Sequence, residues 1–187
     1  GLSTEFQILN DVQQNIILQE VLSKAIYQYF SPQHDPFDFI SAIKQSISRL
    51  KDEGIDDKAF HKSLMATKSK LESNEAGAMS DLSTIYKKYS EFCTAKNSLD
   101  FGDMLIKLQH LLENRKNIKR ELVSRYKYIL VDEFQDTNSI QMDIITNLLD
   151  ESKNIMVVGD DDQAIYRFRG ASVQNILNFR SQFKQAK

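Results

Sequence analysis

The sequence of 187 residues contains few cysteines, prolines and glycines and no long apolar run. Its single cysteine, Cys93, excludes an internal disulfide and predicts a reducing, cytoplasmic setting. The three histidines are far apart and show no spacing with cysteine typical of a metal site. Two prolines and six glycines are few for a loop-rich all-β protein, so helices should dominate. No apolar run approaches the roughly 18 residues of a membrane span, which predicts no membrane partner.

The chain also lacks a strong charge of either sign, with 24 basic and 26 acidic residues and a net charge of −2. This balance excludes a globally basic nucleic-acid coat and a highly charged disordered chain. Any contact with nucleic acid must therefore come from a local basic patch. A hydrophobic content of 41% is enough for a real core in one domain or two small ones.

The first half of the sequence has the apolar spacing of a helical array and carries no chemical motif. Asn10 or Asp11 can cap the first helix, and both prolines fall in one loop. The spacing predicts helices over 11–30, 39–54 and 56–71 and one that includes 82–93, with a loop at 31–36 and a break at 73–77.

The second half changes from helical to mixed character. A helix is expected from Leu99, with Asp100 as its cap. Residues 115–127 follow with six basic residues against one acid, which indicates a solvated helix face or, alternatively, a phosphate contact. The short apolar runs YILV (128–131) and IMVV (155–158) are typical of buried parallel strands. With helical spacing between them, they predict a right-handed βαβ unit.

Both predicted strands are followed by acids: DEFQD (132–136) after the first and GDDDQ (159–163) after the second. Residues 132–162 hold nine acids and one base. Parallel strands bind ligands at their carboxyl ends, where two carboxylates suit Mg²⁺ and the orientation of an attacking water. Asp132 and Glu133 can serve one site only if the strand stops there, because successive side chains of a strand point to opposite faces. The alternative is a solvated acidic loop with helix-capping aspartates.

The charge reverses after these acids: residues 163–187 contain five bases and no acid. The segment YRFR (166–169) interleaves aromatic rings with arginines. Rings can stack on unpaired bases and arginines can contact phosphates, which favours single-stranded DNA as a ligand. The alternative is a packed edge whose arginines extend their charged ends into water.

These segments together resemble a known family. VDEFQDTN (131–138) closely resembles motif II, the Walker B element, of superfamily 1 DNA helicases of the UvrD/Rep/PcrA type. VGDDDQAIYRFRGA (158–171) resembles their motif III, at the separation the family shows. LDFGDML (99–105) resembles the helix that leads back into the motor domain, and residues 1–97 resemble, by position and helicity, the helical insertion domain 1B.

The resemblance implies a role for each matching residue. Asp132 and Glu133 would form the metal and catalytic pair, with Asp132 on the Mg²⁺ of MgATP and Glu133 activating the water that attacks the γ-phosphate. Gln135 would link motif II to its neighbours. The remaining implied roles belong to Gln163, which would contact the γ-phosphate, and to Tyr166, Phe168 and Arg169, which would lie toward single-stranded DNA. Most relatives carry Trp where Phe168 stands, so the stacking surface is smaller here.

The resemblance also implies what is missing. None of the six glycines opens a G-x-x-x-x-G-K-[ST] phosphate loop. The sequence therefore resembles the middle of a helicase and is not expected to hydrolyse ATP by itself. The expected fold class is α/β and predominantly helical: a helical domain at 1–97 joined to a partial RecA-like parallel sheet at 98–187 that lacks its P-loop strand. The unpaired edge of 155–158 would then invite a non-native dimer.

The leading interpretation is a fragment of an ATP-dependent 3′–5′ DNA helicase or translocase. Its cofactors would be ATP and Mg²⁺, and its partners single-stranded and forked DNA and the remaining motor domains of its parent chain. A close alternative is the motor of a RecB/AddA-type helicase–nuclease. Two alternatives from other classes are a stand-alone metal-dependent nuclease or phosphatase and, for residues 1–97, a helical interaction module.

Overall fold

The computed structural model describes residues 3–30, 39–160 and 179–184. The described chain is predominantly helical and carries two small parallel sheets of two strands each. It forms two compact units, the first made of Gly1–Lys51 and Ile55–Met104, the second of Asp52–Gly54 and Leu105–Lys187. The sequence pattern did not indicate that three residues between two early helices belong to the second unit.

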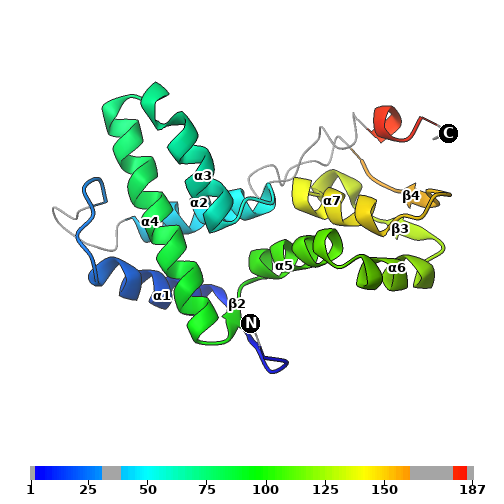
Figure 1. Ribbon diagram of the computed structural model, residues 1–187, viewed down its shortest axis with the longest axis horizontal. Coiled ribbons are helices and arrows are strands. Elements are labelled where there is room, and N and C mark those ends of the chain that lie inside the picture. The colour runs from blue at the N-terminus through cyan, green and yellow to red at the C-terminus, as the bar shows by residue number, and fades with distance from the viewer. Residues whose placement is uncertain (1–2, 31–38, 161–178, 185–187) are drawn as a thin grey trace. The chain divides into compact units, whose positions relative to one another are not determined.

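The first unit is built around one long helix. Its elements are β1 (Gln7–Ile8), α1 (Asp11–Ser23), α2 (Ile40–Asp52, whose last residue belongs to the second unit), α3 (Asp57–Thr67), the 3₁₀ turn η1 (Lys68–Lys70), α4 (Ser73–Ala95) and β2 (Ser98–Leu99). Helix α4 packs against α1 and α3 (Figure 1), and β1 pairs with β2 in parallel. Ile85, Tyr86 and Tyr89 of α4 are almost fully buried in the core, together with Leu18 of α1 and Ile43 of α2.

Two predictions for this unit were wrong in detail. Helix α1 ends at Ser23 instead of residue 30, and the backbone N–H groups of Tyr29 and Phe30 donate to the carboxylate of Asp81 instead of continuing the helix. The predicted break at 73–77 is the start of α4. No atom lies within 4 Å of a Cβ added at Gly77, so packing imposes no break there. The loop predicted at 31–36 lies outside the described residues.

The prediction that Asn10 or Asp11 caps the first helix was confirmed for Asn10. Its side chain accepts from the backbone N–H of Gln13, and the Gln13 side chain accepts from the backbone N–H of Asn10. This reciprocal pair satisfies two backbone donors that the first turn of a helix otherwise leaves free.

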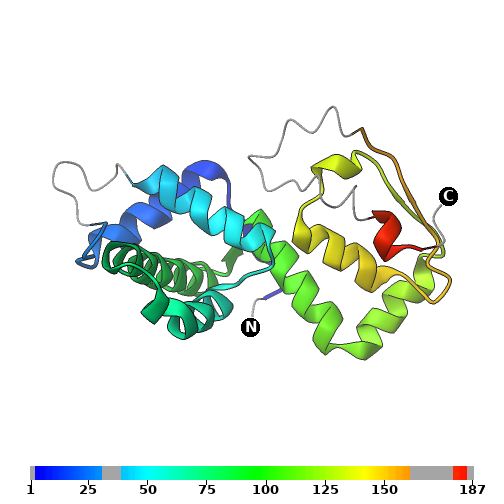
Figure 2. The same cartoon turned by 90° about the horizontal axis from the view of Figure 1, so that it is seen from above.

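The second unit contains the βαβ arrangement. Its elements are α5 (Phe101–Asn114, whose first turn belongs to the first unit), α6 (Lys116–Arg125), β3 (Ile129–Val131), the 3₁₀ turn η2 (Phe134–Asp136), α7 (Ser139–Leu148) and β4 (Ile155–Val157). Strands β3 and β4 pair in parallel, with Leu130 opposite Met156, which confirms the predicted pairing. Ile106 and Leu112 of α5 pack with Ile140 and Ile144 of α7 to form the core. Figure 2 shows α5, α6 and α7 of this unit from above.

The strands are less buried than predicted. Leu130 is 72% exposed and Met156 is 58% exposed, whereas their neighbours Ile129 and Ile155 are half-buried. Alternate side chains of a strand point to opposite faces, so the described residues cover only one face of the β3–β4 sheet. Helix α6 buries none of its residues, in agreement with a solvated basic face.

No helix within the described ranges combines the length and apolarity needed to cross a membrane.

Candidate functional site

The candidate site lies where β3 and β4 end. Beyond the last paired residues the two segments stay joined: the backbone N–H of Val158 donates to the carbonyl of Val131 at 2.8 Å, and that of Phe134 donates to the carbonyl of Val158 at 2.9 Å. The chain after β3 and the chain after β4 therefore leave the sheet at the same edge. This brings the segment that begins at Asp132 beside the one that contains Gly159, as the parallel pairing predicted.

The strand stops before the two carboxylates, as one shared site requires. Glu133 adopts the left-handed conformation, with φ of 50°, and η2 begins at the next residue. The backbone N–H of Glu133 donates to Oδ1 of Asp132 at 2.9 Å, which holds the Asp132 side chain against the turn. A left-handed conformation is uncommon outside glycine and costs energy, and such residues are concentrated at functional sites. Both carboxylates are exposed and open to a ligand.

Gln135 connects the two segments through one buried carboxamide. Its side chain is 2% exposed. Its Nε2 donates to Oε2 of Glu133 at 2.5 Å, and its Oε1 accepts from the backbone N–H of Asp160 at 3.0 Å. A Cβ added at Gly159 would lie 2.7 Å from this Oε1, so the close approach requires glycine. Gln135 thus orients Glu133 and fixes the chain after β4 at the same time.

The site rests on a packed base. Phe134 is 1% exposed, and its ring lies edge-on to Phe179 with 5.4 Å between centroids. The Thr137 hydroxyl donates to the carbonyl of Phe134 at 2.7 Å. Asn138 then caps α7 in a reciprocal pair with Gln141. These bonds make the segment from Glu133 to α7 one continuously hydrogen-bonded turn.

The donor set is compatible with Mg²⁺. Mg²⁺ prefers oxygen ligands and is commonly held by one or two carboxylates while it keeps several waters, and Asp132 and Glu133 supply two. In addition, Oδ1 of Asp136 is buried and has no hydrogen-bond partner among the described residues. Such an oxygen is costly unless a donor or cation meets it. Within the described residues no three His, Cys, Asp or Glu side chains gather closely enough to hold a metal by themselves.

The other predicted site residues could not be placed. Gln163, Tyr166, Phe168 and Arg169 lie outside the described residues, as do the acids at 161 and 162. Of the predicted catalytic, nucleotide and metal residues, the described part of the chain therefore contains Asp132, Glu133 and Gln135.

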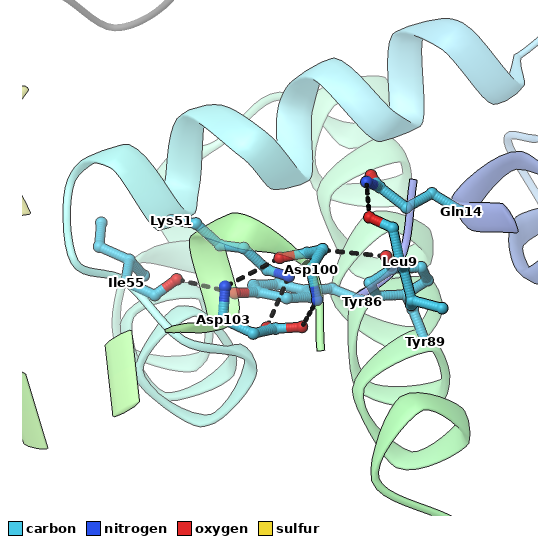
Figure 3. A network of polar contacts seen from close by, with 8 residues as sticks. All are labelled: Leu9, Gln14, Lys51, Ile55, Tyr86, Tyr89, Asp100 and Asp103. Atoms are coloured by element: carbon cyan, nitrogen blue, oxygen red, sulfur yellow. Dashed lines mark hydrogen bonds and ion pairs between the residues drawn. The ribbon is translucent and has the colours of Figure 1, made fainter. Parts of the chain in front are cut away.

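A second polar cluster, in the first unit, was not predicted. Lys51 is 2% exposed, and its ammonium contacts Oδ2 of Asp100 and Oδ1 of Asp103 at 2.6 Å each. The Tyr89 hydroxyl donates to the same Asp100 oxygen at 2.9 Å. Figure 3 shows Lys51 between the two aspartates, beside the rings of Tyr86 and Tyr89. The backbone N–H of Asp103 donates to Oδ1 of Asp100, which confirms Asp100 as the cap of α5.

The cluster tunes the ionisation of its members. Burial acts to raise the pKa of Asp100, but the adjacent Lys51 ammonium outweighs burial and holds that pKa below its usual value. Burial acts to lower the pKa of Lys51, and the two aspartates outweigh it and raise that pKa. The sequence carried a signal for this cluster. Lys51 follows Ile40, Ile43 and Ile47 at helical spacing, so a charge occupies the apolar face of α2.

Comparison with known proteins agrees with the geometry. The family model described as UvrD/REP helicase N-terminal domain matches residues 1–184, so the chain belongs to this family. The chain is 31% identical over its whole length to the ATP-dependent DNA helicase PcrA of Staphylococcus epidermidis, covering 24% of that protein. It is 33% identical over its whole length to a probable DNA helicase II homolog of Mycoplasma capricolum and covers 24% of that relative too. The chain thus spans about a quarter of the length of the curated relatives it matches.

Proposed function

We propose that this chain is part of the motor of an ATP-dependent DNA helicase or translocase that moves 3′ to 5′ on single-stranded DNA. The observation that carries the proposal is the Gln135 bridge, which joins Glu133 to the backbone of Asp160 in a chain of this family. Segments 131–138 and 158–171 then act as motifs II and III. Residues 1–97 act as the insertion domain 1B and residues 98–187 as part of a RecA-like domain 1A.

In this proposal ATP is hydrolysed at the edge where β3 and β4 end. Asp132 and Glu133 would hold the Mg²⁺ that accompanies ATP, and when bound that ion would neutralise phosphate charge. Glu133, oriented by Gln135, accepts a proton from the attacking water. The water oxygen bonds to the γ-phosphorus while the bond from that phosphorus to the β,γ-bridging oxygen breaks, which releases ADP and phosphate. Gln163 contacts the γ-phosphate.

The DNA contact follows motif III directly in sequence. Tyr166, Phe168 and Arg169 lie toward single-stranded DNA, with Phe168 stacking on a base. Gln135 accepts a hydrogen bond from the backbone N–H of Asp160, and Tyr166 follows Asp160 closely in sequence. The wider partners are forked DNA and the remaining motor domains of the parent chain, which also supply the phosphate loop and cover the exposed face of Leu130 and Met156. In the isolated chain that open sheet favours a non-native dimer.

The experiment that tests the proposal is DNA-stimulated ATP hydrolysis by the complete protein that carries this chain. Glu133→Gln keeps the shape of the side chain but cannot accept the proton, so turnover should fall at least 100-fold while ATP still binds. Glu151→Gln, which removes one negative charge at an exposed position of the same unit, is the control. Equal turnover in both variants contradicts the proposed role of Glu133, and absence of hydrolysis by the unaltered complete protein overturns the proposed function.

A further inference from the structure

The turn that follows α2 belongs to the second unit, although it lies between two helices of the first half of the chain. Gly54 has φ of +73°, and the backbone N–H of Ile55 donates to the carbonyl of Leu50 at 2.8 Å. This is the usual left-handed glycine end of a helix. It leaves the two preceding carboxylates, Asp52 and Glu53, at the end of α2.

Both carboxylates accept hydrogen bonds from the start of α7. Nδ2 of Asn138 donates to Oδ1 of Asp52 at 2.7 Å, and the Ser139 hydroxyl donates to Oε2 of Glu53 at 2.7 Å. The contact joins residues 86 positions apart in sequence. Two negative charges also suit this end of α7, because the N-terminus of a helix carries partial positive charge.

The same turn is held from a second side. A Cβ added at Gly54 would lie 3.2 Å from Oε1 of Gln109. Gln109 is buried, and its Nε2 donates to Oδ2 of Asp143 on α7 at 3.0 Å. Within the second unit, the side chains of Asp52 and Glu53 therefore bond to the start of α7, and Gly54 lies close to Gln109 of α5.

Both ends of the Asn138 carboxamide are hydrogen-bonded, which fixes its orientation. It is 6% exposed. Its Oδ1 accepts from the backbone N–H of Gln141 at 3.0 Å, its own N–H donates to Oε1 of Gln141 at 3.0 Å, and its Nδ2 is used by Asp52. From Asn138 back to Glu133, η2 is closed by bonds from the N–H of Asp136 to the carbonyl of Glu133 and from the N–H of Thr137 to that of Phe134.

From this arrangement we propose that Asp52 and Glu53 are positioning residues for the segment that carries Asp132 and Glu133. They fix the start of α7, and the hydrogen-bonded turn transmits that position to Glu133. The inference rests on the proposed function for its catalytic consequence, but its structural part stands on the contacts alone. A displacement of Asp52 and Glu53 would thereby change the placement of the catalytic carboxylate.

The test swaps the two side chains of the Asp52–Asn138 hydrogen bond. Asn138→Asp retains a helix cap, since Asp and Asn cap equally well, but it loses the amide donor and faces the carboxylate of Asp52. Asp52→Asn combined with Asn138→Asp reverses the direction of the bond and restores it. Amide hydrogen exchange at pH 7 is measured in the 187-residue chain, with Glu151→Gln as a control that removes one exposed charge of the same unit.

We expect Asn138→Asp to speed exchange at Asp136, Thr137 and Met142 by about tenfold, with no change at Leu112 in the interior of α5. The Asp52→Asn, Asn138→Asp double variant should restore the slow exchange rates. The inference would be overturned by unchanged rates at these three amides or by an equal rise at Leu112. It would also be overturned if the Asp52→Asn, Asn138→Asp double variant did not restore the slow rates.

Turnover in the complete protein supplies the second measurement. Asn138→Asp should lower kcat about tenfold, with KM for ATP within twofold of the unaltered value. The Asp52→Asn, Asn138→Asp double variant should restore kcat. Altered amide hydrogen exchange in Asn138→Asp with an unaltered kcat would overturn the positioning role of Asp52 and Glu53. If the unaltered protein shows no ATP hydrolysis, the proposed function fails, and the exchange result alone decides whether the turn positions this segment.

Discussion

The ammonium of Lys51 lies 2.6 Å from Oδ2 of Asp100, and both side chains are buried. Lys51 belongs to the last turn of α2, and Asp100 caps the first turn of α5. A Cβ added at Gly102 would lie 2.7 Å from Cδ of Lys51, so the start of α5 approaches the lysine stem closely. Tyr89 of α4 donates to the same aspartate. Within the first unit the pair therefore joins the end of α2, the side of α4 and the first turn of α5 at one point.

Replacing Lys51 should be costly because it leaves two buried aspartates without their cation. Lys51→Met keeps the length of the side chain and removes its charge, and we expect the free energy of unfolding to fall by about 3–5 kcal/mol. Lys44→Met is the control, since Lys44 contacts the exposed Asp11 at 3.5 Å and should change stability by less than about 1 kcal/mol. Urea denaturation measures both. Similar losses in the two variants would contradict a structural role for the cluster.

Substitution of Gly159 should disturb the candidate site. An alanine Cβ would lie 2.7 Å from Oε1 and 3.2 Å from the backbone nitrogen of Gln135, so the carboxamide must leave Glu133 or Asp160. Overpacking of this kind costs about 1–3 kcal/mol. Gly77→Ala is the matched control, because its Cβ meets no atom within 4 Å inside a helix and should stabilise the chain by about 0.5–1 kcal/mol. Thermal unfolding of the two variants should shift in opposite directions, and a shift in the same direction would refute the argument.

Stability should depend on pH through Asp52. Burial raises the pKa of Asp52 to about 6; the hydrogen bond from Asn138 opposes this and the charge of Glu53 adds to it. A carboxyl whose pKa is higher in the folded than in the unfolded chain loses stabilisation as pH rises from about 4 through 6. Asp52→Asn should therefore gain stability relative to the unaltered chain over that range, because it cannot ionise. The measurement is urea unfolding at pH 4, 5, 6 and 7, and a constant difference between the two proteins would exclude this titration.

Single-stranded DNA binding should depend on salt and on Phe168. Phosphate contacts release counterions, so affinity falls as salt rises, and loss of a stacked ring costs about 1–3 kcal/mol per base. Phe168→Ala should weaken binding at both of two salt concentrations by a similar factor. Binding that is unaffected by Phe168→Ala would instead place the contact on another surface, with the basic helix α6 as the first to test. Fluorescence anisotropy with a labelled oligonucleotide measures both effects.

Local patterns in the sequence determined much of the fold and part of the site. Two short continuous apolar runs with helical spacing between them predicted the parallel pairing of β3 with β4, because strand formation and helix spacing are both properties of neighbouring residues. The sequence offered Asn10 or Asp11 as the cap of α1 and Asp100 as the cap of α5, because capping needs only a short polar side chain beside the first turn, and the structure selects Asn10 of the first two. The placement of Asp132 and Glu133 just after a strand followed in the same way.

Contacts between distant residues were decided only by the tertiary structure. Lys51 meets Asp100 across 49 positions and Asp52 meets Asn138 across 86, and no local pattern records such a partner. The same holds for Gln135, whose carboxamide spans from Glu133 to the backbone of Asp160 only because β3 and β4 lie in register. A sequence specifies which side chains can ionise or donate, whereas burial and distance, which set the strength of each interaction, exist only once the chain has folded.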